Sequence, residues 1–151
     1  MSNPYEIFQV DEAAENETGV FLEYPVPGHS DKAFRVRIVH AGDTNPAYRN
    51  AVRFRLKPLN FKIQHDLATD EELISAIIPV FAEKIVKDWE VLNDGEWVKG
   101  IYADDFSILP VSQQNIIDVL HKAPRLFKDI RSQAESLAVF KADARKESAK
   151  N

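Results

Sequence analysis

A tryptophan followed at short range by a tight turn, within residues 86–98, constrains the fold more than any other feature of this sequence. Upstream of Trp89, apolar residues recur at the spacing of one helical face, and the tryptophan continues that stripe by one more turn. Downstream, Asp94-Gly95 supplies the residue with positive φ that a tight turn requires. We therefore expect a long helix over residues 70–90 that runs close to a turn. Its apolar face consists of Ile74, Ile77, Ile78, Phe81 and Ile85.

The composition predicts one globular domain with a sizeable core, since 44% of the 151 residues are hydrophobic. The longest apolar run, residues 76–82, is far shorter than the roughly 20 residues that cross a bilayer, and no charged-then-apolar leader opens the sequence. We therefore expect no membrane span and a cytosolic protein. The sequence has no cysteine, which excludes disulfides, thiolate zinc sites and thiol nucleophiles.

Charge is distributed unevenly along the chain. The net charge of −5 argues against general nucleic-acid binding, yet one stretch is locally basic. We interpret this stretch as a solvated face, because the aromatic residues between its basic residues keep the alternation of a core-facing element. Its basic residues are Arg35, Arg37, Arg49, Arg53, Arg55, Lys57 and Lys62.

The first 42 residues are predicted to be rich in β-structure. Residues 34–38 alternate between apolar residues and arginine, which is the period-2 pattern of a strand with one wet face. Residues 20–24 form a second candidate strand, and residues 5–10 form a third.

Four helix starts can be recognised in the rest of the sequence. Asn45-Pro46 combines a favourable N-cap with proline at the first helical position. Thr69-Asp70-Glu71-Glu72 has the pattern of a capping box. Ser112 is expected to cap a shorter helix, and Ala123-Pro124 to end it and to begin a last helix that runs to about Phe140.

Two of these helices contain irregular positions. Residues 52–56 alternate as a strand would, although we favour a helix there, and Pro58 stops either element. Pro79 lies inside the helix predicted over residues 70–90 and removes a backbone donor, so we expect a bend or a restart at that point.

Together these elements predict an α+β, predominantly helical fold. In it, a small N-terminal antiparallel β-sheet is followed by a helical bundle with a short hairpin or loop between helices. The expected organisation is a β-rich N-terminal part at 1–42, a helical core at 43–140 and a polar C-terminal tail at 141–151.

No constellation of residues points to catalysis. The hydroxyl residues lack a glycine-flanked elbow, the five glycines form no phosphate-binding loop, and the four histidines lack the spacing of a metal site. Asp104-Asp105 is the alternative, since paired carboxylates act as acid and base when a pocket raises one pKa, but we expect a solvated loop there. We therefore predict a protein that is not an enzyme and that uses no metal and no cofactor.

A series of short motifs follows in order through the second half of the sequence. It comprises the helix leading to Val86-Lys87-Asp88-Trp89, the turn Asn93-Asp94-Gly95, Ser112 with Asn115-Ile116-Ile117 and Leu120, and Ala123-Pro124-Arg125-Leu126 followed by Ile130, Ala134 and Phe140. This order resembles the tail assembly chaperones of long-tailed, siphovirus-like bacteriophages, which are small and mostly helical. The resemblance covers residues 45–140 and leaves the β-rich start uncovered.

The resemblance implies a non-catalytic protein of virion morphogenesis that binds the tape measure protein, keeps it soluble and helps recruit the tail tube protein. It also implies a location in the host cell cytoplasm, absence from the mature virion, and a longer form of the same chain made by ribosomal frameshift. A homo-oligomer is compatible with it, and neither a nucleic acid nor a membrane is expected as a partner. The alternative is a structural virion component, a tail tube or completion protein, which the β-rich N-terminal part favours.

Five apolar residues in the C-terminal half are predicted to contact the client protein. The reason is that a helix near a mobile chain end leaves part of its apolar face uncovered until it binds. Packing in the protein's own core is the alternative, which we favour for Phe127 and also for Trp89. The predicted contacts are Trp97, Leu126, Phe127, Leu137 and Phe140.

Overall fold

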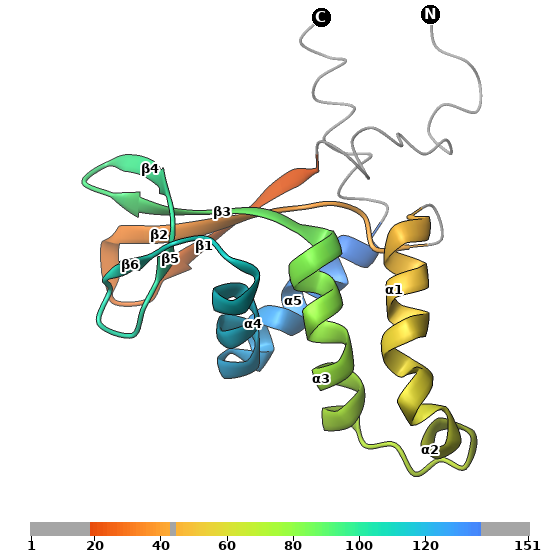
Figure 1. The fold of residues 1–151 in the computed structure, drawn as a ribbon. Coiled ribbons are helices and arrows are strands. Elements are labelled where there is room, and N and C mark those ends of the chain that lie inside the picture. The colour runs from red at the N-terminus through yellow and green to blue at the C-terminus, as the bar shows by residue number, and fades with distance from the viewer. Residues whose placement is uncertain (1–18, 43–44, 137–151) are drawn as a thin grey trace, which may run out of the picture.

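The computed structural model describes residues 19–42 and 45–136, in which two hairpins of strands form one sheet and the helices lie on one side of it (Figure 1). Helices α1 and α3 stand side by side and extend away from the sheet, with α2 at their far end. The elements are β1 (Val20–Val26), β2 (His29–Ile38), α1 (Pro46–Leu56), the 3-10 turn η3 (Lys57–Leu59), α2 (Asn60–Gln64), α3 (Asp70–Val80), the π-helical segment η4 (Phe81–Ile85), β3 (Val86–Asn93), β4 (Glu96–Lys99), β5 (Ile101–Tyr102), β6 (Ile108–Leu109), α4 (Gln113–Lys122) and α5 (Pro124–Glu135).

The main sheet is antiparallel and has the strand order β1-β2-β3-β4. The turn between β3 and β4 is the predicted one: Asp94 and Gly95 have φ values of 51° and 81°, as a two-residue turn with positive φ at both central positions requires. β2 pairs with β3 although α1, α2 and α3 lie between them in the sequence. β5 and β6 form a separate two-stranded sheet.

The core lies between the sheet and the helices. Val36 of β2 and Trp89 and Val91 of β3 point to this side and are at most 2% exposed. Leu120 of α4 and Ile130 of α5 meet them from the helical side and are fully buried. The opposite face of the sheet carries charged residues in register, so the sheet has one dry and one wet face.

The predicted fold class is wrong, because the described residues do not form a predominantly helical protein built on a bundle. A four-stranded antiparallel sheet and a second small sheet take up a large part of the chain, and the helices pack on the sheet. The main error is the helix expected over residues 70–90. Helix α3 ends at Val80, directly after Pro79, and the chain passes through the π-helical segment η4 into β3.

Trp89 therefore belongs to a strand and not to a helix. Ile85 and Trp89 are four residues apart, and that spacing fits one face of a helix but also fits one face of a strand, because side chains of a strand alternate. This segment forms a strand because it pairs with Phe34, Arg35 and Val36 of β2. The local sequence pattern does not reveal that pairing. The expectation that Trp89 is a core residue is confirmed.

Several local signals are confirmed. Asn45 accepts a hydrogen bond from the Tyr48 amide at 3.2 Å and caps α1, which remains helical through residues 52–56. Ser112 accepts one from the Asn115 amide at 3.1 Å and caps α4. α5 begins at Pro124 as predicted, but it ends at Glu135 and not near Phe140.

The N-terminal strands are longer than predicted. β1 continues through Pro25 to Val26 with an irregular register, and β2 begins at His29. The third strand candidate, residues 5–10, and the predicted tail at 141–151 lie outside the described residues.

Replacing Thr69 by alanine is expected to lower the free energy of unfolding by about 1 kcal/mol, because it removes the N-cap of α3. The hydroxyl of Thr69 accepts from the Glu72 amide at 3.1 Å, and the Glu72 carboxylate accepts from the Thr69 amide at 3.2 Å. A hydrogen bond from Lys62 and the bond from Thr69 hold the pKa of Glu72 below its ordinary value. Urea unfolding measures the loss, and Thr69→Ser should stay close to the parent protein. A loss of the same size in both variants would contradict the capping role.

Replacing Tyr24 by phenylalanine is expected to lower the free energy of unfolding by about 1–2 kcal/mol. The reason is that the Tyr24 hydroxyl of β1 donates to the Asp129 carboxylate of α5 at 2.6 Å. Burial, and then the bond to Asp129, raise the pKa of Tyr24. This part of the stability is therefore present below about pH 10, where an unfolded tyrosine ionises, and is lost as the pH rises further. When Asp129→Ala is added to Tyr24→Phe, the free energy of unfolding, measured with urea, should fall only slightly further. Full additivity of the two losses would show that the two groups do not interact.

Candidate functional site

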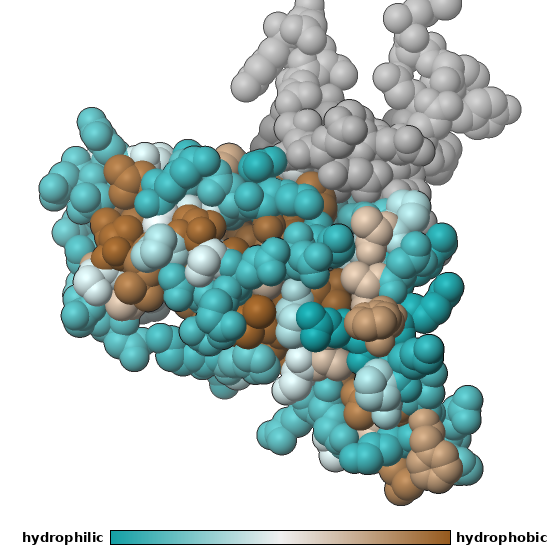
Figure 2. Space-filling model, viewed as in Figure 1, coloured by the Kyte–Doolittle hydropathy of each residue, from teal (hydrophilic) through white to brown (hydrophobic). Residues whose placement is uncertain are grey.

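Large apolar side chains are exposed along the far end of the helical hairpin formed by α1 and α3. Phe54 of α1 is 74% exposed, Phe61 and Ile63 of α2 are 68% and 38% exposed, and Leu67 in the loop after α2 is 61% exposed. Figure 2 shows hydrophobic residues at the lower end of the molecule, where Figure 1 places α2. A single exposed apolar residue is ordinary, whereas several on one projecting element are typical of an interaction site. We call these four residues the hairpin tip.

Backbone hydrogen bonds hold the tip in place. α2 ends at Gln64, and Asp66 adopts a φ of 55°. The Asp66 amide donates to the Ile63 carbonyl at 3.2 Å, and the Leu67 amide donates to the Lys62 carbonyl at 2.7 Å. These are the two bonds of a Schellman cap. The apolar side chains are therefore displayed by a closed turn, which lowers the entropy lost when they bind a partner.

The charge on the segment that leads to the tip, which comprises α1, η3 and α2, is strongly one-sided. Residues 45–65 contain five arginine or lysine residues and no aspartate or glutamate. Lys62 pairs with Glu72 of α3 at 2.7 Å. The other four basic residues are exposed and form no ion pair within the described part of the chain. These residues are Arg49, Arg53, Arg55 and Lys57.

The expected solvated face is thus present on α1, but Arg35 of the same basic stretch behaves differently. Its guanidinium lies 4.5 Å from the ring centroid of Phe21 and 4.4 Å from that of Trp97, on the wet face of the sheet. It also donates to the Glu90 carboxylate at 2.8 Å. Arg35 therefore binds three neighbours within its own sheet.

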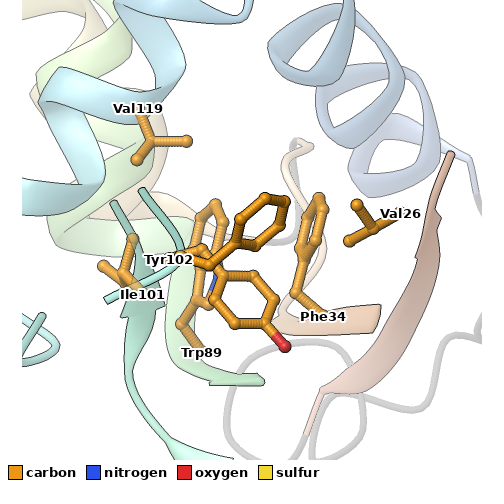
Figure 3. Close-up of a pocket in the computed structure, with 7 residues that line it drawn as sticks. Val26, Phe34, Trp89, Ile101, Tyr102 and Val119 are labelled. Carbon is orange, nitrogen blue, oxygen red and sulfur yellow. The ribbon is translucent and has the colours of Figure 1, made fainter. Parts of the chain in front are cut away.

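An apolar cavity of about 200 Å³ lies between the sheet, the β5–β6 hairpin and α4. In Figure 3 the rings of Phe34, Trp89 and Tyr102 line it, and Val119 approaches from α4. Among the lining residues, Trp89 carries an indole N–H and Tyr102 a hydroxyl, which donates to the Leu92 carbonyl at 2.6 Å. The lining contains no carboxylate, histidine, lysine or arginine, and burial raises the pKa of Tyr102, so the lining carries no group poised for acid–base chemistry near neutral pH. Its lining consists of Val26, Phe34, Trp89, Ile101, Tyr102, Phe106 and Val119.

The acidic pair considered as an enzymatic site lies in an exposed loop, as expected. Asp105 accepts from the Ser107 hydroxyl at 2.6 Å and from the Ser107 amide at 3.0 Å, which lowers the pKa of Asp105. Asp104 pairs with Lys122 of α4. A catalytic acid needs a raised pKa, and the environment of Asp105 acts in the opposite direction.

Two further observations concern the part of the chain that the structure describes. Within residues 19–42 and 45–136, no three histidine, aspartate or glutamate side chains are grouped so that they could hold a metal ion. None of the helices in these ranges has both the length and the apolar character that a membrane span needs.

The five predicted client contacts lie in different surroundings. Trp97 on β4 and Leu126 on α5 are both half-buried, and Leu126 packs against the core. Phe127 is 2% exposed, and its ring meets that of Phe81 edge-on at 5.2 Å, so the core alternative holds for this residue. Leu137 and Phe140 lie outside the described residues.

The residues of the hairpin tip were missed by the sequence interpretation. The signal for Phe54 was its position between Arg53 and Arg55, which places the ring among residues of the solvated side of α1. For Phe61, Ile63 and Leu67, the signal was the proximity of Pro58, which limits the length of any element in which they could be buried.

Comparison with known proteins gives one result. The model of the YdaY prophage protein family matches residues 43–151, more than two thirds of the chain, and this region contains the whole helical hairpin with its tip. No curated protein and no solved structure matches the chain.

Proposed function

Because this chain belongs to the family of YdaY prophage proteins and is phage-derived, we propose that it is a bacteriophage tail assembly chaperone. In this role it catalyses no reaction. It binds the tape measure protein in the host cytoplasm, keeps it soluble and helps recruit the tail tube protein. It leaves before the virion is complete.

The observation that carries this proposal is the hairpin tip. A chaperone of a long hydrophobic polypeptide needs apolar side chains that are uncovered in the free protein, so that the client can cover them. Phe54, Phe61 and Leu67 are each more than half exposed. The Schellman cap holds the last two on a closed turn, and an amphipathic client helix can place its apolar residues against such a surface.

A structural virion component is the second candidate, and the sheet favours it. With the order β1-β2-β3-β4, the strands β1 and β4 each have one edge without a partner strand among the described residues. Free edges can pair with a neighbouring subunit, as a tail tube made of repeated subunits requires. Mass spectrometry of purified particles separates the candidates, because a structural component is present in stoichiometric amount and a chaperone is absent.

Co-expression with the tape measure protein of the same prophage tests the chaperone proposal. The soluble fraction of the tape measure protein is measured with and without this chain. We expect a clear increase when the chain is present, and the two proteins should elute together in size-exclusion chromatography. An unchanged soluble fraction would mean that the proposal is wrong.

A further inference from the structure

We propose that the hairpin tip selects client segments in which apolar residues are flanked by acidic ones, as in an acidic amphipathic helix. This inference rests on the proposed function and names the class of segment that the chaperone binds. It follows from how charge and apolar surface are combined on α1 and α2.

The charge of residues 45–65, which include α1, η3 and α2, is opposite to that of the protein as a whole. The chain has 24 acidic and 19 basic residues, yet five basic residues and no acidic residue fall within residues 45–65. The remainder of the chain is therefore strongly negative. An acidic partner is therefore attracted to the segment 45–65 and, on average, repelled by the rest of the chain.

The positions of these cations match one side of a helix. Arg49, Arg53 and Lys57 follow one another at intervals of four residues, which places them in a row along α1 and into η3. All three are exposed and make no ion pair within the described residues. Phe54 lies three residues before Lys57, so it is a helical neighbour of the end of this row. A partner that covers Phe54 is therefore placed next to Lys57 and gains affinity if it carries an acidic group at that point.

An anionic membrane is the other surface that combines negative charge with an apolar interior. Two features of the tip favour a protein segment instead. The charge of Lys62 is already neutralised by Glu72. The side of the tip that leads into α3 carries three exposed acidic residues, Asp66, Asp70 and Glu71. An extended anionic lipid surface that covered the tip would meet these carboxylates, whereas a single helix can lie along α1 and η3 and avoid them.

Two designed peptides test the inference with the full-length protein. Both are amphipathic helices with the same leucine face, and their polar faces carry either glutamate or lysine. Fluorescence anisotropy of the labelled peptides gives the two affinities. We expect the glutamate peptide to bind about tenfold more tightly, because several exposed ion pairs form. The difference should largely disappear at about 1 M salt, where charges are screened beyond about 3 Å.

A charge variant and a matched control locate the effect. The triple variant Arg49→Gln, Arg53→Gln, Lys57→Gln should lose the preference for the glutamate peptide. The control variant removes the same charge from exposed positions outside the helical hairpin and should keep the preference for the glutamate peptide. It carries Lys87→Gln, Arg125→Gln and Lys128→Gln. Circular dichroism confirms that both variants are folded.

Three results would overturn the inference: equal affinities for the two peptides, binding of neither peptide, or an equal loss in the control variant. Binding to phosphatidylglycerol vesicles as tight as to the glutamate peptide would also overturn it, in favour of a membrane surface. The peptide assay and the co-expression assay can fail separately, so a failure of this inference can be told apart from a failure of the proposed function. A soluble tape measure protein with no peptide preference contradicts only this inference, and a clear preference with an insoluble tape measure protein contradicts only the chaperone.

Discussion

Replacing Trp89 by alanine is expected to lower the free energy of unfolding by about 3–5 kcal/mol, since the whole indole is lost from the core. The side chain is 2% exposed on the dry face of β3, and its ring stacks on Phe34 at 5.7 Å with an angle of 11°. It also forms one wall of the apolar cavity, so alanine would enlarge an existing void of about 200 Å³. Small proteins are stable by about 5–15 kcal/mol in total, so this one substitution removes a large share. Urea unfolding followed by circular dichroism measures it.

Trp97 provides the matched control, because it is the other tryptophan of the chain and lies on the opposite face of the sheet. Its side chain is half-buried, and its ring centroid lies 4.4 Å from the Arg35 guanidinium. Trp97→Ala is therefore expected to cost about 1 kcal/mol, the size of a partly exposed cation–π contact. If Trp89→Ala does not fold, Trp89→Phe should still unfold at a lower urea concentration than Trp97→Ala. Equal losses at the two positions would contradict the assignment of the dry and wet faces.

Helix starts could be predicted from the sequence because the chemistry that makes them is local. Asn45, Thr69 and Ser112 each accept a hydrogen bond from an amide three residues later, and each is recognisable within four residues of sequence. The Asp94-Gly95 turn was predictable for the same reason, since its positive φ angles are a property of two adjacent residues. These positions are confirmed.

The sheet could not be predicted to the same extent, because its stability comes from contacts that are distant in sequence. Val36 lies beside Trp89 in the sheet, although α1, α2 and α3 separate them in the sequence. The local sequence of neither strand indicates that the two strands pair. The apolar stripe before Trp89 is a true helical face only up to η4, and the same residue types then continue as a strand. The π-helical segment η4 lies where the helical spacing gives way to the alternation of a strand. Nothing in the local sequence pattern marks where η4 ends.

The exposed tip illustrates the opposite error. Apolar residues near the chain end were preferred as client contacts, with core packing favoured for Phe127 alone among them, and Phe127 does fill the space beside Phe81. Phe54 and Phe61 were passed over, although their neighbours are charged or follow a proline. Burial depends on which elements are available to cover a residue, and this is a property of the assembled fold. Hydrophobicity alone does not distinguish a residue that fills the core from one that awaits a partner.

Replacing both Phe54 and Phe61 by glutamine is expected to raise the dissociation constant for the client by at least about a hundredfold. Buried aromatic anchors each contribute about 2 kcal/mol or more to an interface, and a loss of 2.7 kcal/mol is about a hundredfold. Glutamine is chosen because it is polar and has a high helix propensity, so α1 and α2 keep their stability. Both rings are mainly exposed in the free protein, and the melting temperature should therefore change by only about 2 °C or less.

A second variant separates the loss of a binding surface from a general loss of apolar surface. Ile108→Gln with Val111→Gln removes two apolar side chains that are 41% and 36% exposed near β6, away from the helical hairpin. This control should bind the tape measure protein as the parent does, in pull-down and in the co-expression assay. Normal binding by the Phe54 and Phe61 variant would remove the tip as the client site. In that case the contacts would have to lie elsewhere, and the free edges of β1 and β4 would become the first place to look, as the structural alternative requires.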